Sequence, residues 1–144
     1  MEEEEAPPGP QIDVSALEIS PPGECNIEAP LGLGMRFSNN MDLASHVWRL
    51  RYQVDTSKRR KIVEIGETAV SDYPAGVHNS MVFSADSGFD VSNLPPEFQT
   101  TKDGLLTAHL VGPDGREVAS VNMVVQIFIG ADGTLKRYIF NPLE

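Results

Sequence analysis

Side chains that could act as an acid, a base, a nucleophile or a metal ligand are few in this sequence, and they stand far apart. The three histidines, His46, His78 and His109, fall on separate predicted elements, and none has a ligating partner two or four residues away. Cys25 is the only cysteine and stands in a proline-rich stretch, where a histidine base aimed at its sulfur is not expected. The spacing therefore predicts neither a metal centre nor a cysteine nucleophile.

Two further patterns match only part of a calcium-binding or phosphate-binding motif. Asp86, Asp90 and Asp103 border a long link, but the D-x-D spacing of a calcium loop is missing. Gly32 and Gly34 form a glycine pair, but the lysine and the following helix of a phosphate-binding loop are missing. We therefore expect a protein that is not an enzyme and that carries no cofactor and no metal.

Charge is distributed unevenly along the chain. The 144 residues include 21 Asp and Glu against 11 Lys and Arg, for a formal net charge of -10. Six of the eleven basic residues nevertheless fall between positions 49 and 61, where only Asp55 opposes them: Arg49, Arg51, Lys58, Arg59, Arg60 and Lys61. The acidic remainder repels nucleic acid and anionic membranes, so we expect neither as a partner, and it attracts basic proteins. The basic stretch could hold an acidic protein.

The elements that position these residues are predicted by a period of two in hydrophobicity. The pattern is clearest from Val47 to Val54, where Trp48, Leu50 and Tyr52 alternate with arginines and glutamine. Similar runs cover residues 33–38, 61–67, 80–85, 104–111, 116–129 and 135–140, separated by turn signals such as Gly112-Pro113-Asp114-Gly115. About seven to nine short antiparallel strands and no amphipathic helix predict an all-β, immunoglobulin-like β-sandwich, with a closed barrel as the alternative.

The basic cluster at residues 58–61 falls at the tip of a predicted hairpin. The strand before it is anchored by Trp48 and Tyr52, and the run after it by Val63 and Ile65. This position favours a solvated turn. A docking edge for an acidic protein is the second interpretation, and a nuclear import signal or a nucleic-acid contact is the third.

The first thirty residues differ in composition from the rest. They contain eight acidic residues and six prolines, which predicts a flexible arm over residues 1–30 and a β-sandwich domain over residues 31–144. Within the arm, residues 12–19 could pair with a sheet edge. The run Met1–Glu5 is unlike a secretory signal, no apolar run reaches 18 residues, and one cysteine permits no internal disulfide. We expect a cytoplasmic protein, with the nucleus as the alternative.

One set of short segments resembles the anti-silencing-function histone chaperones, a family of immunoglobulin-like sandwiches of similar size. The matching segments, in chain order, are Met35–Phe37, Trp48–Tyr52, Pro74–His78, Met81–Asp86, Gly104–Thr107, Gly115–Val118 and Leu135–Asn141. The resemblance implies a surface that binds a histone dimer. It places Ser120 and Val124 where the family carries an arginine and a tyrosine, Glu67 beside the position of an aspartate, and Leu106 at an apolar contact.

Binding by a sheet face or a strand edge is the remaining interpretation for a sandwich without catalytic motifs. We predict a non-catalytic protein–protein interaction module, an adaptor or assembly subunit of a larger complex. A histone chaperone that binds a histone dimer is the alternative. The candidate protein-binding residues are Arg49, Arg51, Lys58, Arg59, Arg60, Lys61, Glu67, Leu106, Ser120, Asn122 and Val124.

Overall fold

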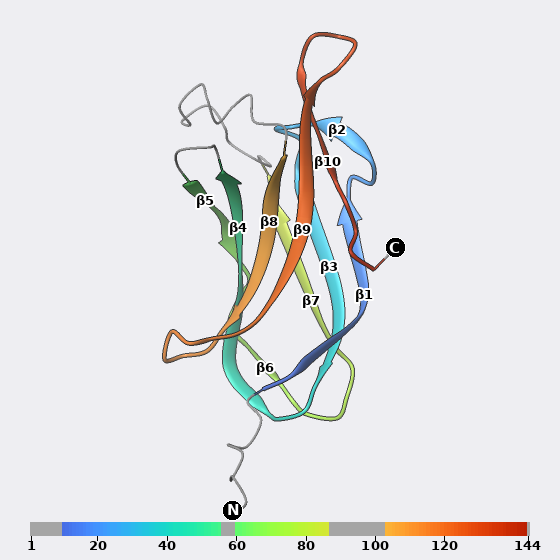
Figure 1. Cartoon of the computed structure of the whole chain (residues 1–144). Helices are drawn as coiled ribbons and strands as arrows, with labels where there is room; N and C mark the ends of the chain where they lie inside the picture. Colours follow the sequence, from blue (N-terminus) through green and yellow to red (C-terminus); the bar gives the residue numbers. More distant parts are fainter. Residues whose placement is uncertain (1–9, 56–59, 87–102, 144) are drawn as a thin grey trace, which may run out of the picture.

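The structure, a computed structural model, describes residues 10–55, 60–86 and 103–143. The described residues form ten strands and no helix (Figure 1). In chain order the strands are β1 (Ile12–Ser20), β2 (Glu24–Asn26), β3 (Leu31–Asn39), β4 (Leu43–Asp55), β5 (Arg60–Glu67), β6 (Ser71–Tyr73), β7 (Asn79–Ala85), β8 (Asp103–Val111), β9 (Glu117–Ile129) and β10 (Leu135–Ile139). Two of the candidate protein-binding residues, Lys58 and Arg59, lie outside the described ranges. So does most of the link between Asp86 and Asp103.

The strands pair into two sheets that lie face to face (Figure 1). The smaller sheet has the order β1-β3-β7, and the larger has the order β2-β10-β9-β8-β4-β5, with β6 paired to β4. Every pairing is antiparallel. The predicted all-β sandwich is therefore confirmed. The described part of the chain contains no helix long and apolar enough to cross a membrane.

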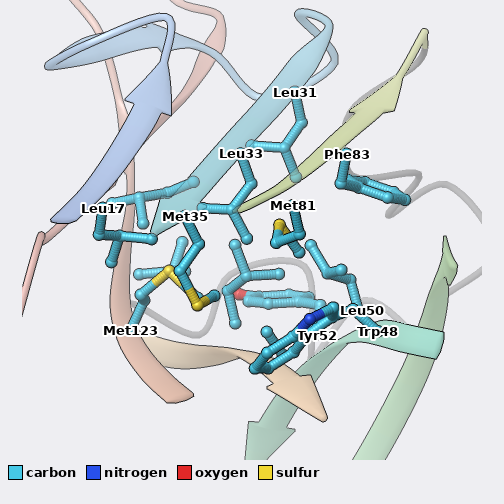
Figure 2. Close-up of a cluster of buried hydrophobic side chains, with 14 of the residues drawn as sticks. Leu17, Leu31, Leu33, Met35, Trp48, Leu50, Tyr52, Met81, Phe83 and Met123 are labelled. Carbon is cyan, nitrogen blue, oxygen red and sulfur yellow. The ribbon is translucent and has the colours of Figure 1, made fainter. Parts of the chain in front are cut away.

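The core fills the space between the sheets, as the alternation in the sequence predicts. Figure 2 shows Leu33 and Met35 of β3 meeting Leu50 and Tyr52 of β4 and Met123 of β9. Each of these side chains is buried. Since every second residue of a strand points inward, the alternate residues of β4, β8 and β9 must line the outside of the larger sheet.

The predicted flexible arm over residues 1–30 is wrong for its described part, residues 10–30. β1 pairs with β3 along almost its whole length, and β2 pairs with β10. Leu17 of β1 and Ile27, just after β2, are buried in the core. The expected edge pairing of residues 12–19 is thus confirmed, and the sandwich begins at Ile12 instead of residue 31, because β1 supplies one of the three strands of the smaller sheet.

A buried arginine fixes the turn between β2 and β3. The side chain of Arg137, on the inner face of β10, is 1% exposed. Its Nη1 donates to the carbonyl oxygens of Ile27 at 2.6 Å and Ala29 at 2.9 Å, and its Nη2 donates to that of Pro30 at 3.2 Å. Burial lowers the pKa of this guanidinium below its ordinary value. Arg137 therefore ties the turn at residues 27–30 to the last strand.

Candidate functional site

The register of the larger sheet places most of the predicted binding residues on one surface. We call the side of this sheet that faces away from the smaller sheet the outer face. Across β5, β4, β8 and β9 its side chains form three rows: Glu67, Arg49, His109 and Ser120; Glu64, Arg51, Thr107 and Asn122; and Ile62, Gln53, Leu105 and Val124. Arg49, Arg51, Glu67, Ser120, Asn122 and Val124 were predicted from separate segments of the sequence, and all lie on the outer face.

The arginines of the outer face are matched by carboxylates. Arg49 Nε lies 3.1 Å from Glu67 Oε2, and Arg51 Nε lies 3.0 Å from Glu64 Oε1. Both acids come from β5, directly across the ladder. Exposed pairs of this kind contribute only about 0.2–1 kcal/mol each, so their main effect is on the local charge. The outer face is consequently a mixed-charge surface, whereas the composition of residues 49–61 indicated a basic one.

An arginine is also paired with a carboxylate where β4 ends and β5 begins. Arg60 Nε lies 2.8 Å from Asp55 Oδ1, and the hydrogen bond from Arg60 is the main cause that holds the pKa of Asp55 below its usual value. Lys61 is exposed but lies opposite the inward-facing Val54, so it does not belong to the outer face. Of the basic cluster at residues 58–61, the structure describes Arg60 and Lys61. Arg60 is therefore held in an ion pair, and Lys61 lies on the other side of β5.

One predicted contact residue is wrong. The side chain of Leu106 is 0% exposed and belongs to the core between the sheets. Its neighbour Leu105 pairs with Val124 on the outer face. Since successive residues of a strand face opposite sides, an error of one position moves the side chain from the surface to the core. The apolar residue of β8 that lies on the outer face is thus Leu105.

An exposed apolar row crosses the outer face beside the ion pairs. We define the apolar row as Ile62, Leu105, Val124 and Phe140, of which Ile62, Val124 and Phe140 are between 45% and 48% exposed. On β4 the row passes over Gln53. Phe140 belongs to it because its backbone nitrogen donates to the carbonyl of Val124 at 2.9 Å and because the residue before it points inward. The row passes from β5 to the end of β10, about 19 Å at a strand spacing of ~4.8 Å.

An aromatic pair extends the apolar row at its β10 end. The ring of Tyr138 packs against that of Phe140, with centroids 4.7 Å apart. Tyr138 lies opposite Gln126 on the outer face and is partly exposed. Sequence reasoning missed Ile62, Leu105, Tyr138 and Phe140. The alternation of residues 137–140 could have shown that two aromatic side chains share a face.

The polar centre of the outer face contains one chain of contacts with catalytic residue types. His109 Nε2 lies 2.8 Å from Thr107 Oγ1, and His109 Nδ1 lies 2.8 Å from Glu117 Oε1. The order hydroxyl, imidazole and carboxylate is that of acyl-transfer triads. Thr107 is only 7% exposed, however, and its hydroxyl also lies 3.4 Å from the carbonyl oxygen of Arg51. Thr107 and His109 both line a hollow in the outer face, and the contacts hold the His109 ring in position there.

The remaining residues with chemical potential are separate from one another. His46 is buried near the start of β4, with Nδ1 2.9 Å from the carbonyl oxygen of Ala44, and His78 is exposed before β7. In the ranges that the structure describes, no three His, Cys, Asp or Glu side chains gather in a way that could hold a metal ion.

Comparisons with known proteins give little guidance. No protein-family model matches the chain, and no curated protein matches it. Among solved structures, β-glucosidase 3B from Thermotoga neapolitana in complex with glycerol aligns with a TM-score of 0.42 and 13% sequence identity. The alignment covers 90% of this chain but only 17% of that chain. A likeness this distant supports no statement about activity.

Proposed function

We propose that this chain is a non-catalytic protein-interaction module, an adaptor or assembly subunit, that binds its partner through the outer face of the larger sheet. The observation that carries the proposal is the apolar row. Three of its four side chains are nearly half exposed. The solvent-facing side of an antiparallel sheet usually carries polar residues, so the pairing of the strands does not explain apolar side chains at these positions. An exposed apolar surface with a polar border is typical of a protein-binding site.

The arrangement around the apolar row fits the anatomy of protein interfaces. Such interfaces have an apolar centre, with aromatic residues often supplying most of the affinity, and a polar rim. Here Tyr138 and Phe140 supply the aromatic groups, and the pairs Arg49–Glu67 and Arg51–Glu64 border the row on one side. We expect the apolar row to supply affinity and the ion pairs to select partners with matching polar groups.

The net charge suggests the chemistry of the partner. A chain with a formal charge of -10 attracts basic proteins over distances of about the Debye length, ~8 Å at physiological salt. We therefore propose a partner that presents apolar side chains surrounded by basic ones. Its association should slow as salt concentration rises, because long-range attraction is screened.

A histone dimer is the second candidate. The resemblance to the anti-silencing-function chaperones supports it, and so does the acidity, since histones are basic. Ser120 and Val124 stand where that family carries an arginine and a tyrosine. A histone dimer would therefore lose a charge-assisted contact and an aromatic anchor here, and binding would depend on the apolar row.

Affinity capture with the tagged full chain tests the proposal. Val124→Asp places a charge in the apolar row, and Val77→Asp places the same charge at a similarly exposed position in the turn before β7. We expect specific partners of the wild type to be retained by Val77→Asp and lost by Val124→Asp, with equal thermal unfolding of both variants. Retention of every partner by Val124→Asp would refute the assignment of the surface.

A separate arm of the experiment tests the second candidate. Purified histone dimer is added to the immobilised chain at moderate salt. Binding that Val124→Asp abolishes would support the chaperone hypothesis. Absence of binding removes the histone candidate and leaves the capture experiment to decide the general proposal.

A further inference from the structure

The outer side of the smaller sheet is a second surface, turned away from the outer face of the larger sheet. We call it the small-sheet face. The register places Glu18, Gly34 and Val82 in one row across β1, β3 and β7, and Ala16, Arg36 and Ser80 in the next. The third row is Ser20, Gly32 and Ser84. These residues give a flat surface with a shallow hollow over Gly34, next to a single large apolar side chain.

Val82 is that side chain, and it is exposed to an unusual degree. It is 76% exposed, the largest fraction among the large hydrophobic residues that the structure describes. Its neighbours across the strands are small or have no side chain, so nothing in the sheet covers it. A valine in this position is well suited to pack against another surface.

Gly34 leaves the hollow open without an internal reason for being glycine. A Cβ atom at this position would meet only Glu18 Cβ, at 3.9 Å, which is an ordinary contact. Gly34 also does not have a positive φ, unlike Gly23 and Gly76. Glycine in a strand interior weakens the strand, and it often marks a place where another backbone or a ligand approaches closely. The open space above Gly34 is therefore available to a partner.

Opposite charges lie on either side of this hollow. Glu18 on β1 and Arg36 on β3 are diagonal neighbours, and both are exposed. In the described part of the chain neither side chain makes an ion pair, in contrast to Arg49, Arg51 and Arg60 on the larger sheet. The small-sheet face thus carries a carboxylate, a guanidinium, the protruding side chain of Val82 and the hollow over Gly34.

We propose that this face binds a second copy of the chain to form a two-fold symmetric dimer. A two-fold axis in the plane of the face and diagonal to the strands places Arg36 over Glu18 of the second copy. The same rotation sets the two copies of Val82 against each other, at the edge of the hollow over Gly34. The charge contact then occurs twice, as an isologous interface requires. The strands of the two copies cross near a right angle, which is one of the two usual packings of sheets.

Sedimentation velocity of the full chain over a concentration series tests the dimer. Val82→Asp removes the protruding apolar side chain and adds a charge, whereas Val124→Asp is the matched control on the other sheet. We expect a dimer for the wild type and the control, and a dissociation constant raised at least about ten-fold for Val82→Asp, equivalent to the loss of ~1.4 kcal/mol. A wild-type chain that stays monomeric at all concentrations overturns the proposal, as does a Val82→Asp variant that dimerises normally.

Charge reversal distinguishes the proposed geometry from a dimer of another kind. Glu18→Arg and Arg36→Glu should each weaken the dimer, because like charges then meet across the two-fold axis. The double variant Glu18→Arg/Arg36→Glu should recover affinity, since it restores both pairs in reverse. Failure of the double variant to recover contradicts the proposed contacts. These residues are exposed, so the variants should fold, and the outcome is independent of binding at the apolar row.

Discussion

Replacement of Arg137 by methionine should destabilise the protein more than any change of an exposed arginine. Methionine is apolar and matches only the aliphatic part of the arginine side chain, so it cannot donate to the carbonyl groups of Ile27, Ala29 and Pro30. The bond to Ile27 is buried and the other two are partly buried, and a buried carbonyl without a donor costs about 1–3 kcal/mol. Part of this cost is offset, because Arg137→Met also removes the expense of burying a charge.

Balancing these effects gives an expected loss of about 3 kcal/mol in the free energy of unfolding. For a chain of this size such a loss lowers the melting temperature by roughly 6–12 °C. Urea and thermal unfolding, followed by circular dichroism, measure both quantities. Arg116→Met, in the exposed turn between β8 and β9, is the matched control and should change the free energy by less than about 0.5 kcal/mol.

The free energy of unfolding of Arg137→Met can also refute this account. A loss below about 1 kcal/mol for Arg137→Met would mean that the guanidinium does not hold the turn at residues 27–30. Water or a local shift would then satisfy the three carbonyl groups. An equal loss for Arg116→Met would show that the effect is not specific to the buried site.

Three further predictions concern close packing, pH and salt. Gly104→Ala should cost about 1–3 kcal/mol in urea unfolding, since a Cβ there would lie 2.6 Å from Cε1 of the buried Tyr52, whereas Gly34→Ala should not destabilise. Hydrogen bonds from the hydroxyl and backbone of Thr134 and from Lys136 lower the pKa of Asp132 from 3.8 to about 2, so its contribution to stability is complete above pH ~4 and disappears as pH falls toward 2. Asp132→Asn should remove that part of the pH dependence of the urea midpoint, and an unchanged profile would contradict the assignment. Association with a basic partner should slow at least several-fold between about 50 and 500 mM salt in stopped-flow measurements, and a salt-independent rate would exclude electrostatic steering.

Alternation in the sequence predicts the centre of the sandwich correctly, because the physical cause is local. Trp48, Leu50 and Tyr52 face the core as expected, and the arginines between them face outward. β1 and β2 were assigned to a flexible arm since prolines and acidic residues dominate the composition there. What orders them is distant in sequence: β3 pairs with β1, and β10 pairs with β2.

The candidate site could be predicted only in part, since register is a long-range property. The outward residues of β4 and β9 were identified, but the sequence does not show that Glu64 and Glu67 lie opposite the arginines. A bulge near Gly66 sets that pairing. Arg137 has the pattern of an outward polar residue in a strand, although it is buried, because its partners are backbone carbonyl groups more than a hundred residues away.

Photo-crosslinking tests the central claim, that the outer face binds the partner, most directly. The full chain carries a benzophenone side chain in place of Val124 in one variant and in place of Val77 in another, and each is irradiated with the captured partner. We predict a covalent adduct from position 124 and none from position 77. An adduct from position 77 alone would contradict the proposed binding surface.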